Sequence, residues 1–575
     1  MIKYICDVII RETRMKSVFP SRNNGSMRKL IRKLDELSSR DSIKYLVYAS
    51  SILFFFAFIL LPPIIGILEN ISQVETILHE PNLLARANAA IIQSFFMAFI
   101  IATLDLVAAL PLAWFIVRSR IELAHIIDTM VDIPFLIPTA ALGYSTLLFW
   151  GRPDGISRIF GVESLVPEGF LLVFLLHFSF SYPVIVRVMV GELLNYKEVY
   201  EIAARTLGAQ PLTAVRTITL PLLKPGIIAS FLLAFARSLS ETGATVMVAG
   251  QWENGPVFLF RVIDMVGLPE HLKSSVLVYV SSILIFTSTI LFFLISLLAP
   301  KFRFPIRRVF PSIERRLSSS KIIRFRNGLT LLVFLLVVLS PSLFIALPMI
   351  GALIDGTLGE ALVGSGPWGE FWRSMTISYA IGSLSTIVNI IFGLPAAIVI
   401  ARRKLGGATP IFKALISIPI IVPSIALGVS LRLFWGRYYF LHEFWILLFS
   451  HTTITYTYFV ESMAAAMESI PLEIEEVAST LGAKPLTIFR EITLPLTKYS
   501  MFSGAVLVFT RALGETGAAK AVARTKEFWT TPILLVNWIK DGKIIGSQKA
   551  LSVGLYIILS FIILLALRLL TRRRK

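Results

Sequence analysis

The sequence predicts an all-α polytopic membrane protein. Of its 575 residues, 55% are hydrophobic and only 16% are charged, and its mean hydropathy is +0.77. A soluble protein has charged residues at about a quarter of its positions. Long apolar runs recur along the chain, for example over Ser42–Leu68 and Ser274–Pro300. Each is long enough for a helix to cross a bilayer, which takes about 20 apolar residues.

The apolar runs predict about 12 transmembrane helices in two sets of six. The first set is expected at 45–68, 88–117, 124–150, 168–192, 227–249 and 274–299. The second set is expected at 328–352, 374–401, 410–435, 443–467, 501–524 and 550–571. If the N-terminus is cytoplasmic, this topology places the Lys/Arg-rich segments in the cytoplasm, as the positive-inside rule requires. We therefore expect a multi-pass protein of the cell membrane with both termini in the cytoplasm.

The two sets of spans form a tandem repeat. Ile133–Arg152 matches Ile418–Arg437 at a shift of 285 residues, and from His177 onward the shift is 274. Equal spans and equal orientation indicate a parallel duplication about an axis along the membrane normal. The predicted order begins with a basic cytoplasmic N-terminal segment (1–44) and a first transmembrane domain (45–300). A basic, loosely ordered cytoplasmic linker (301–327) and a second transmembrane domain (328–575) follow.

Charge and cysteine content exclude several classes of function. The net charge is +19, but the Lys and Arg residues gather at the chain ends and between the halves, so nucleic-acid binding is not expected. Cys6 is the single cysteine, which rules out an internal disulfide and a cysteine metal site, and we expect no metal site. The N-terminal region has no signal-peptide pattern. Met27–Arg40 instead resembles a basic surface helix, and either Met1 or Met27 could be the start.

A polar segment recurs between the fourth and fifth spans of each half. Leu207–Leu222 and Leu481–Leu496 are identical at 12 of 16 positions. A short helix is expected to end at Gly208, since glycine readily adopts the left-handed stop conformation. Pro211 suits the first turn of a second helix, and Leu220–Pro221 is expected to break that helix as a hinge. The pattern predicts a rigid cytoplasmic knob in each half.

These loops resemble those of the permease subunits of ABC importers. The family pattern is Glu-Ala-Ala, three residues, Gly, nine residues, then Ile-x-Leu-Pro. The matching positions in the first copy are Ala203, Ala204, Gly208, Ile218, Leu220 and Pro221. In the second copy they are Glu476, Ala478, Gly482, Ile492, Leu494 and Pro495. Ile202 and Val477 depart from the pattern, and Glu201 and Glu475 lie one residue earlier, so the acidic contact is expected at these two positions.

The resemblance extends over nearly the whole chain past residue 44 and implies the fold of a fused, two-half type I importer permease. It also implies partners: two ABC ATPase subunits that dock on the two loops, and an extracellular or periplasmic substrate-binding protein. The chain has no phosphate-binding loop of the Walker type. We therefore expect no enzyme activity and no cofactor in this chain, with ATP used by the partner subunits. The alternative is a duplicated hairpin that serves folding alone.

Ionisable side chains inside the predicted spans are candidates for the translocation path, because they are costly in a bilayer and often functional. Arg237 and Glu241 in the fifth span have i,i+4 spacing, as do Arg511 and Glu515 in the eleventh. This spacing places each pair on one helix face. Two interpretations remain open: a polar lining of the path, or a self-neutralised pair that holds its span against neighbouring helices.

Single polar residues in other spans are further candidates. His177 and His451 occupy equivalent positions and could either line the path or hydrogen-bond a neighbouring helix. Arg432 stands where the first half has Leu147, which favours an anion contact, although an arginine that extends to the membrane boundary explains it as well.

Two equivalent pairs differ in charge. Arg187 corresponds to Glu461, and Asp105 to Asn389, so the first pair could form an ion pair between the halves.

The phrases around Arg237 and Arg511 resemble the molybdate, sulfate, iron(III) and thiamine branch of the family. The predicted function is therefore the permease subunit of an ATP-driven ABC importer. Its cargo would be a small solute of the oxyanion, iron(III), thiamine or phosphonate type. An ion-coupled secondary transporter is the alternative, but it leaves the two cytoplasmic loops unexplained. A membrane enzyme would need clustered catalytic residues, and the 6 histidines are scattered.

Overall fold

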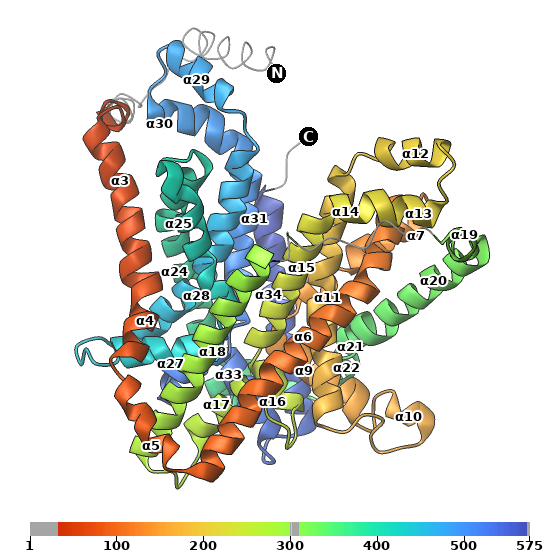
Figure 1. The fold of residues 1–575 in the computed structure, drawn as a ribbon. Helices are drawn as coiled ribbons and strands as arrows, with labels where there is room; N and C mark the ends of the chain where they lie inside the picture. The colour runs from red at the N-terminus through yellow and green to blue at the C-terminus, as the bar shows by residue number, and fades with distance from the viewer. Residues whose placement is uncertain (1–32, 299–300, 302–309, 572–575) are drawn as a thin grey trace.

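The computed structural model describes residues 33–298, 301 and 310–571, and within these ranges every regular element is a helix. Figure 1 shows the helices as one bundle, with the polar loops of the two halves at the same end, at the top of the view. Together with the long apolar helices, this confirms the all-α polytopic class. We refer to residues 33–298 as half one and to residues 310–571 as half two.

The spans of half one follow the predicted order. They are α3 (Asp41–Phe54) with η1 (Phe55–Leu60) and α4 (Leu61–Leu68); α6 (Pro81–Arg118); α7 (Glu122–Met130) with α8 (Ile133–Leu136) and α9 (Thr139–Gly151); α11 (Phe170–Asn195); α15 (Lys224–Ser240) with α16 (Gly243–Val248); and α18 (Glu270–Leu298). Short connecting helices on the side opposite the polar loops are α5 (Val74–Leu78), α10 (Ser157–Phe160) and α17 (Gly255–Asp264).

Half two repeats this order. Its spans are α20 (Ser320–Val333) with η5 (Phe334–Leu339), α21 (Ser340–Leu343) and α22 (Ala346–Ile354); α24 (Trp368–Ala401); α25 (Thr409–Ile416) with α26 (Ile418–Ile421) and α27 (Ser424–Trp435); α28 (Glu443–Glu468); α31 (Leu494–Leu513) with α32 (Gly517–Val522); and α34 (Gly546–Thr571). The connecting helices include α23 (Thr357–Val363) and α33 (Thr531–Lys540).

The count of membrane spans depends on how the bent helices are counted. Within the described residues, 8 helices are long and apolar enough to cross a membrane, or up to 11 if each of three bent pairs is one span. The predicted span that this count leaves out is 443–467, which corresponds to α28. This helix has 26 residues but carries a buried polar row that includes His451, Thr453 and Thr455. Because these side chains face protein instead of lipid, the helix can be long without being uniformly apolar.

The third and ninth spans are not straight helices, which corrects the continuous spans expected at 124–150 and 410–435. They bend by 107° and 103° where α8 meets α9 and where α26 meets α27. Ile137 and Val422, the residues before Pro138 and Pro423, adopt extended backbone. Proline disfavours the helical conformation in the residue that precedes it, so each Pro marks the corner.

The first span of each half packs on the other half. In half one, η1 places Phe55 and Ile59 against Phe412 and Tyr456 of half two. In the reciprocal contact, η5 of half two lies in the core formed by α6 and α11. The chain order alone indicated two separate six-helix domains. The structure instead exchanges their first spans.

The basic linker contains regular structure, which corrects the loosely ordered segment expected at 301–327. Helix α19 (Pro311–Leu317) lies within it, and α20 already begins at Ser320. Residues 302–309 lie outside the described part. The basic helix expected over Met27–Arg40 is present where it is described, since residues 33–38 are helical.

We predict that Ser145→Ala destabilises the exchanged packing. The Ser145 hydroxyl donates to the Pro341 carbonyl (2.5 Å) and accepts from the Ile345 N–H (2.9 Å), both on the first span of half two. Its loss would leave two buried backbone groups unsatisfied, at about 1–3 kcal/mol each. Thermal unfolding in detergent should show a lower Tm for this variant. In the control Ser282→Ala, the lost hydroxyl serves only the Tyr279 carbonyl of its own helix. Equal Tm losses for the two variants would contradict the prediction.

Candidate coupling loops and central interface

In each polar loop, the glycine and the first proline adopt the backbone conformations that the sequence predicts. In half one, α12 (Val199–Thr206) is followed by Gly208 with φ +95°, then by α13 (Pro211–Ala214) with Pro211 in its first turn. In half two, α29 (Leu472–Thr480), Gly482 with φ +87° and α30 (Pro485–Ile488) repeat this arrangement. We call residues 199–222 and 472–496 the coupling loops.

The proline hinge predicted at Leu220–Pro221 is wrong in position. In both halves, a π-helical turn precedes the Leu-Pro pair, which then begins the next helical stretch. In half two, the chain runs from Pro485 to Leu513 without a sharp bend, through Leu494–Pro495. In half one, a 70° bend falls between α14 (Leu220–Leu222) and α15, next to Pro225. Half two has Tyr499 at the equivalent position, so the bend follows the extra proline.

The two glutamates expected to meet a partner face inward instead. Glu201 is buried and lies within 3.3 Å of the Arg118 guanidinium at the end of α6, with Thr219 at 3.4 Å. In half two, the Arg402 guanidinium donates to Glu475 at 2.7 Å, and the Thr493 hydroxyl donates to the same oxygen at 2.9 Å. These carboxylates tie each loop to the end of the second span of its own half.

Each coupling loop carries exposed apolar side chains. Leu207 and Leu481, beside the two glycines, are 90% and 65% exposed. Ile202 takes the family's glutamate position in half one, while half two keeps the exposed Glu476 there. The remaining predicted positions are Ala203, which is exposed, and Ala204 and Ala478, which are half-buried. Exposed apolar groups gathered in one place indicate an interaction surface.

The fifth and eleventh spans break at the centre of the molecule, which corrects the continuous spans expected to 249 and 524. Helix α15 ends at Ser240 and α31 ends at Leu513; α16 and α32 restart at Gly243 and Gly517. Glu241 and Glu515 therefore lie in the breaks and are not in the helices that carry Arg237 and Arg511. Each glutamate accepts a backbone N–H from the next half-helix, Ala244 N at 3.2 Å and Ala518 N at 3.0 Å.

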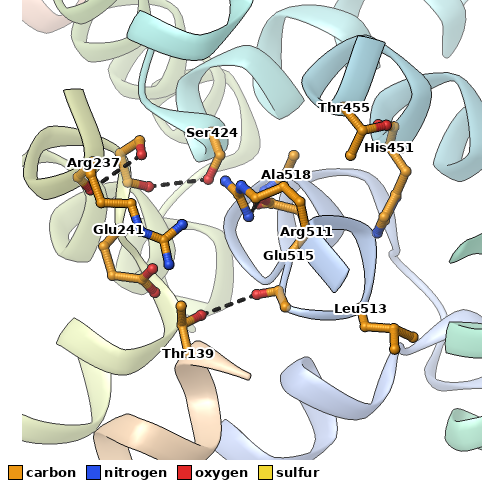
Figure 2. Close-up of polar contacts among 12 residues, drawn as sticks. Thr139, Arg237, Glu241, Ser424, His451, Thr455, Arg511, Leu513, Glu515 and Ala518 are labelled. Atoms are coloured by element: carbon orange, nitrogen blue, oxygen red, sulfur yellow. Dashed lines mark hydrogen bonds and ion pairs between the residues drawn. The ribbon is translucent and has the colours of Figure 1, made fainter. Parts of the chain in front are cut away.

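The ends of the broken helices are bonded across the two halves. Thr139, the first residue of α9, donates its hydroxyl to the Gly514 carbonyl at 3.1 Å. Ser424, the equivalent first residue of α27, donates to the Ser240 carbonyl at 3.2 Å. Figure 2 shows these two contacts on either side of the centre. The residues after Pro138 and Pro423 thus satisfy the carbonyls that a broken helix leaves free.

Two glycines allow the halves to approach at this point. A Cβ on Gly517 would lie 2.6 Å from the Thr242 hydroxyl and 2.7 Å from the Ser424 hydroxyl. A Cβ on Gly243 would lie 2.6 Å from Cβ of Thr516. The sequence reasoning missed this contact, although the shared Glu-Thr-Gly-Ala phrase and the shared Pro-Ser/Thr step were visible in both halves.

The two arginines differ in their pairing. Arg511 forms an ion pair with Glu515 at 2.7 Å, as the sequence allowed. The Arg237 guanidinium lies over the Phe180 ring, 5.5 Å from its centroid. Within the described residues, Nε of each arginine has no hydrogen-bond partner. In Figure 2 their guanidinium groups extend into the space between the two breaks.

His177 and Arg432 join neighbouring helices, whereas His451 bonds within its own helix. His177 bonds the Ser238 and Thr245 hydroxyls at 2.8 Å each, joining α11 to α15 and α16. His451 bonds the Leu447 carbonyl of its own helix at 2.9 Å. Arg432 donates to the Val522 carbonyl at 3.3 Å, where α32 ends. These contacts fit the helix-packing interpretation of His177. His451 makes no hydrogen bond to a neighbouring helix within the described residues, so both interpretations of it stay predictions.

The ion pair expected between the halves is wrong. Arg187 binds Asp128 and Asp132 of its own half, at 2.6 Å each, and Glu461 accepts from Ser417 at 2.5 Å.

Asp105 and Asn389 also bond within their own halves. The Ser181 hydroxyl donates to Asp105, and the Asn389 amide donates to the Thr455 hydroxyl at 2.7 Å.

The described residues contain no group of three His, Cys, Asp or Glu side chains that could hold a metal ion.

Comparison with known proteins decides the family. The family described as "Binding-protein-dependent transport system inner membrane component" matches the chain twice, over residues 106–304 and 389–575. The chain belongs to this family of transport permeases. The two matches confirm the tandem repeat, and they leave out the exchanged first spans. As members of the family do, the chain spans the membrane several times as the permease component of an ABC importer.

Several curated permeases resemble one half of the chain. The molybdenum transport system permease protein ModB of Escherichia coli K12 is 31% identical over 193 residues, which cover 30% of this chain and 81% of that protein. ModB of Mycobacterium tuberculosis is 27% identical over 218 residues, covering 34% and 82%. The sulfate transport system permease protein CysT of Salmonella typhimurium is 28% identical over 215 residues, covering 34% and 72%.

We predict that Gly517→Ala weakens the contact between the halves of this permease. The added methyl group would displace Thr242 and Ser424, and such overpacking costs about 1–3 kcal/mol. The measurement is the Tm in detergent. Gly191→Ala is the matched control, because a Cβ there meets nothing within 4 Å. A Tm for Gly517→Ala at or above that of the control would show that the centre is not closely packed.

Proposed function

We propose that the chain is the complete membrane pathway of an ATP-driven importer for a molybdate- or sulfate-type oxyanion. Two ATPase subunits would bind its coupling loops, and a substrate-binding protein would deliver the anion at the opposite face. The main support for the anion is the pair of arginines at the breaks, Arg237 and Arg511, which approach the interface from both halves. The relatives named for molybdenum and sulfate transport point to the same cargo.

Unpartnered donors on the two arginines favour an anion over the other solutes expected from the sequence, because the two glutamates are already engaged by the protein. Glu241 and Glu515 each accept an N–H at the start of a half-helix, where the positive end of the helix dipole stabilises negative charge. The arginine Nε groups keep donors without protein partners. Guanidinium donors match the oxygens of a tetrahedral oxyanion in both charge and geometry.

The coupling loops support the ATPase partners. Each loop is held by its inward-facing glutamate, Glu201 or Glu475, and presents a leucine beside its glycine stop. Two equivalent loops at one end of the molecule suit a motor of two subunits (Figure 1). In operation, closure of the ATPases would push the loops together and open the pathway outward, and hydrolysis would reset it.

Leu207→Glu combined with Leu481→Glu should weaken ATPase binding. Removal of two exposed apolar anchors from an interface weakens it by about tenfold or more. Co-purification with the tagged ATPase subunit measures this directly. Val266→Glu is the control, since Val266 is 97% exposed and follows α17, which lies at the opposite end of the molecule (Figure 1). Retention of the ATPase by the double variant would refute the docking role of the loops.

Arg237→Gln combined with Arg511→Gln should lower oxyanion uptake by about tenfold or more, because two donors to the anion are lost. Uptake of radiolabelled molybdate and sulfate into proteoliposomes with ATPase and binding protein measures it, beside iron(III) and thiamine. Arg158→Gln, on the exposed α10, is the control. Normal oxyanion uptake by the double variant would remove the arginines from the path. Uptake without any ATPase would favour the ion-coupled alternative.

A further inference from the structure

The second helix of each coupling loop begins without a cap of its own. Gln210 and Lys484 precede α13 and α30, and neither side chain accepts a capping hydrogen bond in the described structure. The first residue of each helix is proline, which has no N–H. In half two, the Ile488 N–H reaches the Lys484 carbonyl at 2.9 Å. The N–H groups that still need acceptors are therefore those of Leu486 and Thr487.

In half two, these acceptors come from the helix at residues 33–38. The Leu486 N–H donates to the Ser38 hydroxyl at 3.2 Å, and the Thr487 N–H donates to the Asp35 carboxylate at 3.1 Å. The Thr487 hydroxyl donates to the other carboxylate oxygen of Asp35 at 2.8 Å. Serine and aspartate are the side chains that cap helix N-termini best. Here they act from a segment about 450 residues away in sequence.

Half one has the reciprocal arrangement. The Leu212 N–H donates to the Ser318 hydroxyl of the linker at 3.2 Å. Glu314 of α19 accepts from the Thr213 hydroxyl, and from the Arg216 guanidinium at 2.6 Å. These hydrogen bonds, the one from Thr213 first, hold the pKa of Glu314 below its usual value, so the carboxylate is ionised near neutral pH. Figure 1 shows α19 beside α13, and α3 beside the loop that contains α30.

Each capping helix leads directly into an exchanged first span. Residues 33–38 continue into α3 and α4, which pack along half two and then join half one through α5. At that far end, the Ile77 N–H donates to the Ser275 hydroxyl of α18 at 3.0 Å. Residues 33–78 therefore form a strap with one end on the coupling loop of half two and the other in half one. Residues 311–363 form the second strap, with one end on the coupling loop of half one and the other in half two.

We propose that Asp35, Ser38, Glu314 and Ser318 are positioning residues that fasten each coupling loop to a strap from the other half. A displacement of one loop would then be passed along the strap to the opposite end of the other half. This inference rests on the proposed function only in taking closure of the ATPase subunits as the cause of the loop displacement. The fastening itself is a property of the permease alone.

Asp35→Asn combined with Ser38→Ala tests the fastening in the full-length permease. Hydrogen exchange at Leu486 and Thr487 should accelerate by about fivefold, since a lost cap is worth about 1 kcal/mol. Ser39→Ala is the matched control, because its hydroxyl bonds Glu36 of its own helix. The Asp35→Glu variant keeps a carboxylate at this position, as half one does with Glu314. Hydrogen exchange at Leu486 and Thr487 should therefore stay slow in this variant. Unchanged exchange in the double variant would overturn the proposal.

A second measurement separates transmission from simple support of the loop. With ATPase and binding protein in proteoliposomes, the Asp35→Asn, Ser38→Ala variant should transport about fivefold less anion per ATP hydrolysed. If the cap only stabilised the loop, uptake and hydrolysis would fall together, and an unchanged ratio would overturn the strap. Failure of the proposed function would be distinct: wild-type protein would show no ATP-dependent uptake, while the exchange result would stand.

Discussion

The structure depends on one constraint at its centre: two transmembrane helices break where the halves meet, and their free backbone groups have to be bonded by protein. Irregular backbone at membrane depth is tolerated only where it is buried in protein or lines a cavity. Here Thr139 and Ser424 serve the carbonyl ends, and Glu241 and Glu515 serve the amide ends. The sharp bends at Pro138 and Pro423 place the Thr139 and Ser424 hydroxyls against the carbonyl ends of the broken helices. The carbonyls at the breaks are therefore bonded because the third and ninth spans bend.

This arrangement also explains why buried charge is tolerated at the centre. Each glutamate compensates the start of a half-helix, and Glu515 also neutralises Arg511. The result is a polar layer in which the backbone at the breaks is bonded, while Nε of Arg237 and of Arg511 has no hydrogen-bond partner among the described residues.

The duplicated halves are not equivalent. Pro225 bends half one at the root of its loop, whereas Tyr499 leaves half two straight. Lys520 stands where half one has Val246, and it pairs with Asp264 of half one at 2.7 Å. The hydrogen bonds at the breaks and at the loop glutamates are kept in both halves. The Lys520–Asp264 pair shows that side chains also diverge where the halves meet, as long as these hydrogen bonds remain.

The sequence by itself determined the class, the repeat and the local form of the loops. Apolar run length requires membrane helices, and Gly208, Gly482, Pro211 and Pro485 act through backbone preferences that need no neighbour. Tertiary structure decided which residues meet. Glu201 and Glu475 turn inward because Arg118 and Arg402 end nearby helices, and the first spans cross to the other half. Such pairings join residues far apart in sequence, so no local propensity encodes them. The same holds for the breaks after Ser240 and Leu513, where hydroxyls from the opposite half bond the Ser240 and Gly514 carbonyls.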